Sequence, residues 1–173
     1  INNGAEYATS ATVTLTVQAE DPESDIIQMR FRVDSWNWSE WKPFATTTEW
    51  DMGTLMEGIH AVHAQFLNKA GLSSFPVFDN IIYDDTPPQV TDFVINSGSI
   101  ATSSTLVSLT IRAVDDISGV TLMKIWNDGQ GEPQGWIPYA ESMTWSLRNE
   151  LGKRTAYAKF INGAGLVSTA EDS

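Results

Sequence analysis

One stretch of the sequence decides the fold, and it reads FLNKAGL at residues 66–72. It occurs again 94 residues later as FINGAGL at residues 160–166, with five of the seven residues identical. In both copies, alternating apolar residues lead directly into a turn built from Asn, Ala and Gly. We therefore interpret the stretch as the end of a β-strand and the turn that follows it, present twice in one chain.

The repeat extends over nearly the whole chain. VTLT at residues 13–16 matches VSLT at residues 107–110, and both lie before the shared turn at the same offset. A period of this length exceeds the roughly 20 to 50 residues of a solenoid repeat and suits a β-sandwich of about 100 residues. We infer a tandem duplication. A further group of matches, displaced by one residue, pairs Trp41, Pro43 and Trp50 with Trp136, Pro138 and Trp145.

Alternation of apolar and polar residues predicts β-strands in both copies, and no segment shows a sustained helical period. Gly, Pro, Asn and Asp cluster between the strands, as turns require. The predicted fold class is all-β, with two tandem immunoglobulin-like β-sandwich domains at residues 1–85 and 86–173. The expected strands are residues 12–19, 27–33, 62–66 and 78–83 in the first copy and residues 107–113 and 156–160 in the second.

The joint between the copies reads DDTPP at residues 84–88, and its two prolines predict an extended, semi-rigid connection. The second copy has a leading segment at residues 87–94 that the first copy, beginning at Ile1, lacks. The first copy has a trailing strand at residues 79–83, and the second copy stops before its equivalent. Each domain is therefore expected to lack a terminal strand in this excerpt, unless neighbouring chains supply it.

Composition excludes several classes of function. The 22 acidic residues against 10 basic ones give a net charge of −12, which disfavours nucleic acid as a partner. There is no cysteine, and no apolar run approaches the roughly 20 residues of a membrane helix. His60 and His63 lie three apart on an expected strand and so face opposite sides, where they cannot share a metal. We expect no enzyme activity.

Several motifs resemble the immunoglobulin-like or fibronectin-III-like repeats of large bacterial and archaeal secreted or cell-surface proteins. They are AVDDISGV at residues 113–120, the Trp-x-Pro-aromatic pieces at residues 41–44 and 136–139, the repeated turn and the DDTPP joint. The first copy departs from this pattern, because EDPESD at residues 20–25 lacks the Ser-Gly step. The resemblance implies an extracellular or cell-surface location and neighbouring repeats or identical subunits as partners.

The function that the resemblance favours is a non-catalytic structural, spacer or assembly module of a larger surface or adhesive protein. One alternative is a glycan- or protein-binding accessory module that uses exposed tryptophans. A second alternative is a filament or surface-layer subunit that strands from its neighbours complete.

Acidic turns suggest a calcium site at one pole of the second copy. A hard cation takes six to eight oxygen ligands from carboxylates, amides and carbonyls. The alternative is that these are solvated turns in which Asp acts as turn former and cap. The candidate ligands are Asp84, Asp85, Asp115, Asp116 and Asn162.

The seven tryptophans divide into two groups. Those that recur in both copies, Trp41, Trp50, Trp136 and Trp145, are predicted to pack in the sandwich cores. Those that do not recur, Trp36, Trp38 and Trp126, are candidates for binding glycan or a protein partner. Partial burial against neighbouring strands is the alternative for this second group.

Overall fold

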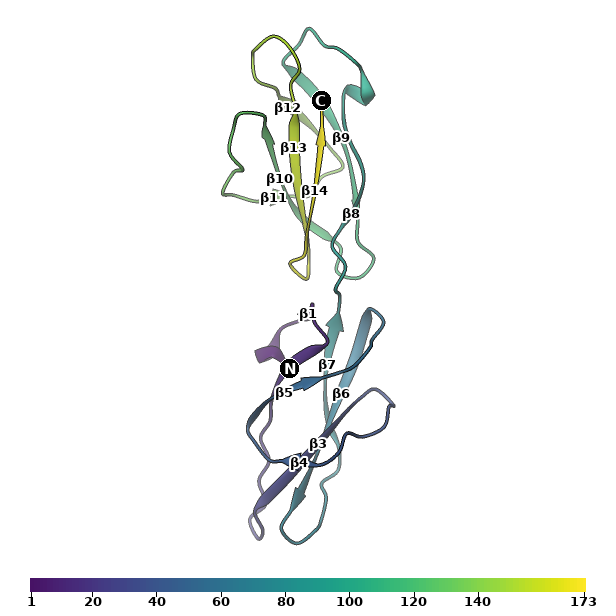
Figure 1. Ribbon diagram of the computed structural model, residues 1–173, viewed down its shortest axis with the longest axis vertical. Coiled ribbons are helices and arrows are strands. Elements are labelled where there is room, and N and C mark those ends of the chain that lie inside the picture. The colour runs from purple at the N-terminus through teal and green to yellow at the C-terminus, as the bar shows by residue number, and fades with distance from the viewer. The chain divides into compact units, whose positions relative to one another are not determined.

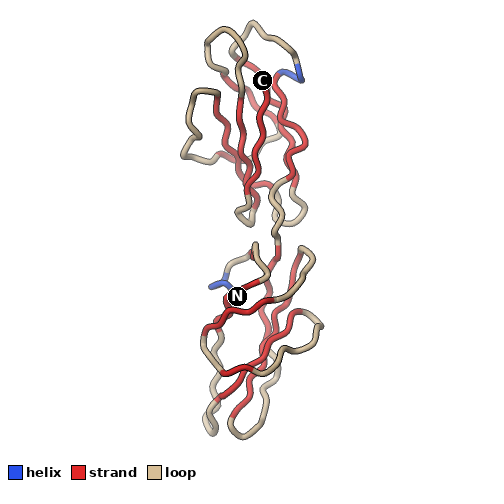
Figure 2. Tube along the Cα trace, viewed as in Figure 1, coloured by secondary structure: helices blue, strands red, loops and turns tan.

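The computed structural model describes residues 1–173 and divides them into two compact units, Ile1–Asp85 and Thr86–Ser173. Strands and loops make up both units, and the only helical elements are the 3-10 turns η1 (Asn2–Gly4) and η2 (Asn96–Gly98) (Figures 1 and 2). The predicted all-β fold class is confirmed. No helix is long and apolar enough to span a bilayer.

The first unit is a sandwich of two sheets. The larger sheet has the strand order β1-β7-β6-β3-β4, and the smaller one pairs β2 with β5. All neighbouring strands are antiparallel except β1 and β7, which run parallel. The strands are β1 (Tyr7–Ala8), β2 (Thr12–Thr16), β3 (Ile26–Val33), β4 (Lys42–Pro43), β5 (Thr47–Asp51), β6 (Gly58–Asn68) and β7 (Val77–Tyr83).

The second unit repeats this arrangement with an additional first strand. One sheet has the order β11-β10-β13-β14, and the facing sheet has the order β12-β9-β8. Apart from β8, each strand has a counterpart in the first unit, in the same chain order. The strands are β8 (Gln89–Ile95), β9 (Leu106–Val114), β10 (Val120–Asn127), β11 (Ile137–Pro138), β12 (Ser142–Ser146), β13 (Ala156–Asn162) and β14 (Val167–Asp172).

The cores follow from alternation along the strands. In β3, Met29, Phe31 and Val33 are buried, while Arg30 and Arg32 between them face outward. In β9 and β13, every second residue is buried in the same way. Full burial of a side chain such as Phe31 stabilises the fold by about 1.5–3 kcal/mol relative to exposure.

The recurring tryptophans do not all lie in the cores. Trp50 packs against the first core and its ring lies 5.7 Å from that of Phe31. Trp145 packs against the second core and its Nε1 donates to Asn127 Oδ1. The prediction is wrong for Trp41 and Trp136, which lie outside the core clusters and pack against cations on the outer sheet face.

The terminal strands differ from the expectation in one respect. The first strand, β8, is present in the second unit and has no counterpart in the first. The second unit also has a last strand, since β14 pairs with β13 over six positions from Ile161↔Val167 to Ala156↔Asp172. The expectation that this strand is missing was wrong, because β14 already begins at Val167, directly after the shared turn, where Ile161↔Val167 repeats the Leu67↔Ser73 bridge of the first unit.

Candidate functional site

The outer face of the larger sheet in the first unit carries a stack of tryptophan and arginine side chains. The Arg30 guanidinium lies over the ring of Trp41 at 4.4 Å and over that of Trp38 at 4.9 Å, and Arg32 lies 4.8 Å from the Trp38 ring. Arg30 is fixed further by donating from Nε and Nη2 to Gln65 Oε1 at 2.9 and 2.6 Å. Each cation–π contact contributes about 0.5–2 kcal/mol, depending on desolvation.

The second unit has a related stack at matched positions. Lys124 corresponds to Arg30, and its Nζ lies 4.7 Å from the centre of the Trp136 ring. Lys124 and Lys159 both donate to Glu132, at 3.0 and 2.5 Å, and these bonds hold the pKa of Glu132 below its usual range. These matched contacts hold the segments just before the edge strands β4 and β11 against the outer faces of their own sheets.

The three tryptophans predicted to bind a ligand have different surroundings. Trp36 follows β3 and is 47% exposed. Trp38 is half-buried and contacts both guanidinium groups, Arg30 and Arg32. Trp126 belongs to the second unit, where its ring stacks on that of Tyr157 at 5.7 Å and 21°. Ligand binding by these residues stays a prediction, with Trp36 the most accessible of the three.

Asp115 and Asn162, two of the candidate calcium ligands, lie together in the second unit. Asp115 Oδ1 accepts backbone N–H groups from Ile117, Ser118 and Gly119 at 2.9–3.2 Å. Asp115 Oδ2 accepts the Asn162 side-chain amide at 2.8 Å. Although partial burial raises the pKa of Asp115, these hydrogen bonds outweigh it and lower that pKa.

The amide oxygen of Asn162 is also engaged, because it accepts the backbone N–H of Leu166 at 2.8 Å. The amide nitrogen donates both to Asp115 and to the Thr86 carbonyl. Asn162 therefore presents N–H groups, and no oxygen, toward Asp115. This geometry fits a clamp between two loops better than a pair of cation ligands.

The remaining candidate ligands are Asp116, which is exposed, and Asp84 and Asp85, which belong to the first unit. Asp84 is buried, and its backbone N–H donates to the Ala8 carbonyl at 3.0 Å. Asp85 accepts the Tyr83 hydroxyl at 2.7 Å, a bond that raises the pKa of Tyr83 to about 12. No three His, Cys, Asp or Glu residues form a group that could hold a metal ion. Calcium binding stays a prediction.

The first unit contains the same loop clamp. Asp21 Oδ1 accepts the backbone N–H groups of Glu23 and Ser24, and Asp21 Oδ2 accepts the Asn68 amide at 2.8 Å. Asn68 Oδ1 accepts the N–H of Leu72, as Asn162 does with Leu166. The recurrence of both the Asp and the Asn in the two copies was the sequence signal for this clamp.

A second clamp lies at the other end of the same strands. Asp34 Oδ2 is 2.8 Å from His60 Nδ1, and Asp34 Oδ1 accepts the Ala61 N–H at 2.9 Å. In the second unit Asp128 Oδ2 accepts from Arg154 Nη1 at 2.9 Å. His60 thus occupies the position that Arg154, which is always charged, has in the second unit. The sequence alone did not reveal this role, because His and Arg differ in residue type.

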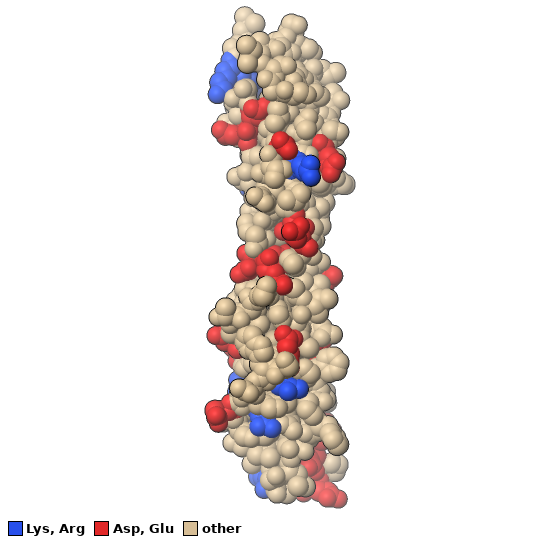
Figure 3. Space-filling model, turned by 90° about the vertical axis from the view of Figure 1, so that its right-hand side faces the viewer, with Lys and Arg blue, Asp and Glu red and all other residues tan.

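Acidic side chains are frequent on the surface of both units. Figure 3 shows more red than blue groups on the face that it presents. With a net charge of −12, such a surface repels other acidic surfaces.

Comparison with known proteins supports the fold and leaves the function open. No family model matches the chain, and no curated protein sequence matches it. The fibronectin(III)-like modules of Clostridium thermocellum CbhA match with a TM-score of 0.50 and 11% identity, over 94% of this chain and 84% of theirs. The fold is that of fibronectin-III-like modules. The FN1–FN3 domains of chicken CNTN1 are 14% identical, with a TM-score of 0.45, over 96% of this chain and 63% of theirs.

The pairing of His60 with Asp34 predicts a pH-dependent stability. Partial burial lowers the pKa of His60, but the bonds to Asp34 and to the Met56 carbonyl outweigh it, so this pKa is raised above 6.5. The stabilisation is therefore complete below the unfolded pKa and is lost as pH rises through the folded one. We expect the unfolding free energy of the first unit to fall as pH rises above about 6.5, measured by denaturant titration.

Two variants sharpen this measurement. His60→Arg, which copies Arg154, should remove the pH dependence above pH 6.5, whereas His63→Gln should leave it in place. Stability in the unchanged protein that is flat from pH 6 to pH 8.5 would contradict the ion pair.

The Asp115 clamp predicts a loss of stability that is independent of calcium. Asp115→Ala leaves the amide of the buried Asn162 without its carboxylate partner and should destabilise the second unit by about 1–3 kcal/mol. Thermal melts should show the same loss in excess Ca²⁺ and in chelator, while Asp116→Ala should have little effect in either. A loss confined to the calcium-containing buffer would instead identify Asp115 as a cation ligand.

Proposed function

We propose that the chain is a non-catalytic structural module of a larger extracellular or cell-surface protein. Its two fibronectin-III-like units serve as stiff folded blocks that set the spacing of whatever they connect. Neighbouring repeats of the same protein are the expected partners. The fold of the CbhA modules, which this chain shares, is consistent with such a role.

The observation that carries the proposal is how the polar groups are used. In both units the same positions form the same loop clamps: Asp21 with Asn68 matches Asp115 with Asn162, and Asp34 with His60 matches Asp128 with Arg154. These groups hold turns at the two ends of the central strands. These side chains pair with one another, and the same pairs occur in both units. Such a pattern supports a mechanical role better than a catalytic one.

A mechanical role predicts two separate unfolding events under force. A single chain pulled from its ends should lengthen in two steps of roughly 25–30 nm, since about 85 residues extend by roughly 3.3–3.6 Å each. The core variant Leu109→Ala should weaken one step only, because a buried Leu→Ala change costs about 2–5 kcal/mol in its own unit. Single-molecule force spectroscopy measures both quantities.

The alternative outcome is equally specific. One step of double length would mean that the two units do not unfold independently. Gradual lengthening without steps would mean that they are not stiff blocks, and either result would overturn the spacer role.

A binding role is the second candidate function, and the exposure of Trp36 favours it. This side chain is 47% exposed on the turn after β3. Aromatic rings exposed on a surface stack on sugar rings or fill a protein interface. We therefore assign recognition of a glycan to this turn.

Binding through Trp36 predicts a change of intrinsic fluorescence on titration with oligosaccharides. Trp36→Ala should abolish the change, while Trp126→Phe, in the other unit, should preserve it. If a panel of plant, bacterial and animal glycans leaves the fluorescence of the unchanged protein constant, the glycan-binding role is rejected.

A further inference from the structure

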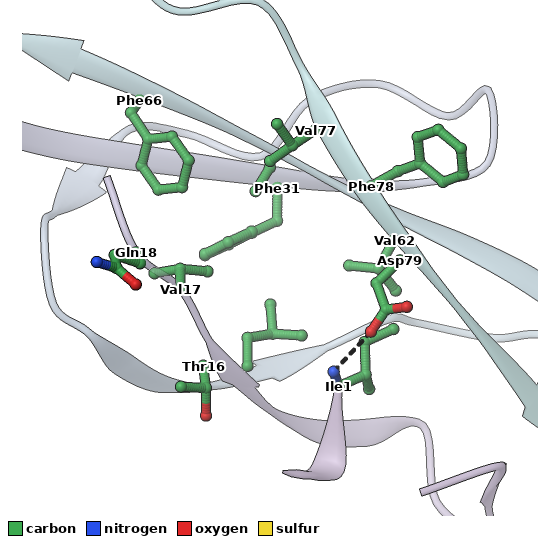
Figure 4. A pocket seen from close by; sticks show the side chains of 12 residues that line it. Ile1, Thr16, Val17, Gln18, Phe31, Val62, Phe66, Val77, Phe78 and Asp79 are labelled. Carbon is green, nitrogen blue, oxygen red and sulfur yellow. Dashed lines mark hydrogen bonds and ion pairs between the residues drawn. The ribbon is translucent and has the colours of Figure 1, made fainter. Parts of the chain in front are cut away.

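The first unit has an open apolar pocket between β2 and β7. Leu15 and Val17 line it from the β2 side, Phe31 and Phe66 form its floor, and Val77 lies at its β7 rim (Figure 4). Its volume of about 190 Å³ is below the roughly 300–1,000 Å³ of small-molecule sites. The pocket has the size of a few side chains.

The corresponding place in the second unit is filled by strand β8. This strand pairs antiparallel with β9, from Gln89↔Val114 to Ile95↔Leu109, and also contacts β14. Phe93 is 7% exposed, and its ring lies 6.5 Å from that of Phe160, the counterpart of Phe66. The same chain thus shows what covers this surface when the sandwich is complete.

Residues that β8 would cover are exposed in the first unit. Val77 pairs with Ala64 as Ala170 pairs with Ala158. Val77 is 57% exposed, whereas Ala170 packs against the second core. Strand β2 also ends at Thr16, while β9 continues through Val114, because the second half of β9 has β8 as its partner.

Ile1 already occupies the place of the last residue of that strand. Its nitrogen donates to Asp79 Oδ2 at 2.9 Å (Figure 4). In the second unit, the Ile95 backbone nitrogen donates to Asp172 Oδ2 at 2.7 Å. The next residue repeats the match, since Asn2 Oδ1 accepts the N–H of Thr14 and Asn96 Oδ1 accepts that of Ser108. A strand in the pocket would therefore end at Ile1, as β8 ends at Ile95.

The backbone edge is oriented to receive such a strand. The Val17 N–H donates to the Thr46 carbonyl, as the Ile111 N–H donates to the Glu141 carbonyl. Because backbone groups alternate in direction along a strand, the N–H groups of Thr16 and Gln18 point to the opposite edge, where β8 lies in the second unit. Both residues are exposed.

We propose that this pocket is a strand-binding site and that its occupant is the segment joined to the nitrogen of Ile1 in any longer chain. The segment pairs antiparallel with β2. It inserts an aromatic or large aliphatic side chain, two positions before Ile1, against Phe66, as Phe93 inserts against Phe160. Ile1 already lies where the last residue of such a strand belongs, so a segment joined to Ile1 enters the pocket directly. For this reason we favour a joined segment over a strand from another molecule. The inference does not depend on the spacer role, since the site lies within one unit.

The test adds six residues, Gln-Val-Thr-Asp-Phe-Val, before Ile1, copying residues 89–94. Hydrogen exchange followed by NMR should show the Thr16 and Gln18 amides exchanging at least about tenfold more slowly than in the unextended chain. The unfolding midpoint of the first unit should rise by roughly 5 °C or more, which corresponds to the burial of one large apolar side chain.

Two controls test whether the aromatic side chain and the covalent connection are both required. The same extension with its Phe changed to Asp should give neither effect. The free six-residue peptide at about 0.1 mM should protect the two amides far less than the joined segment. Equal protection by the free peptide, a dimer of the unextended chain that protects these amides, or an extension without effect would each overturn the proposal.

Discussion

The pairing of β3 with β6, and of β10 with β13, is the constraint on which the rest of each unit depends. Met29 and Phe31 pair with Phe66 and Ala64, and their inner faces form the first core. A shift of one residue in this register would turn the core side chains of the shifted strand to the outside, so the apolar pattern permits one alignment.

The same register positions the polar clamps. Ile26 pairs with Asn68 at one end of the strand pair, which brings Asn68 to the turn of Asp21. At the other end, Val33 pairs with Val62, which places Asp34 beside His60 and Ala61. The polar residues that look chemically suggestive in the sequence are therefore bonded to loops, and this arrangement favours a structural role.

The two units differ most at one edge, where the presence or absence of a strand has consequences for burial. Strand β8 covers Phe160 and lengthens β9, whereas the pocket beside Phe66 stays open and β2 is short. An exposed strand edge beside apolar surface is a site for adding a strand. The place that β8 takes in the second unit is thus an apolar pocket in the first.

The sequence by itself determined the all-β class, the duplication and the positions of several of the longer strands, because alternation is a pattern of neighbouring residues and the repeat shows it twice. Only the tertiary structure decided on which face of a sheet a side chain lies and which residue it contacts. Trp50 and Trp41 both recur, but Trp50 belongs to β5 in the smaller sheet and packs on the core. Trp41 comes directly before the short edge strand β4 of the larger sheet and lies against Arg30 on the outer face. His60 pairs with Asp34 in the first unit as Arg154 pairs with Asp128 in the second. The sequence does not show this equivalence, because the two cationic residues differ in type and their Asp partners lie in a distant part of the chain.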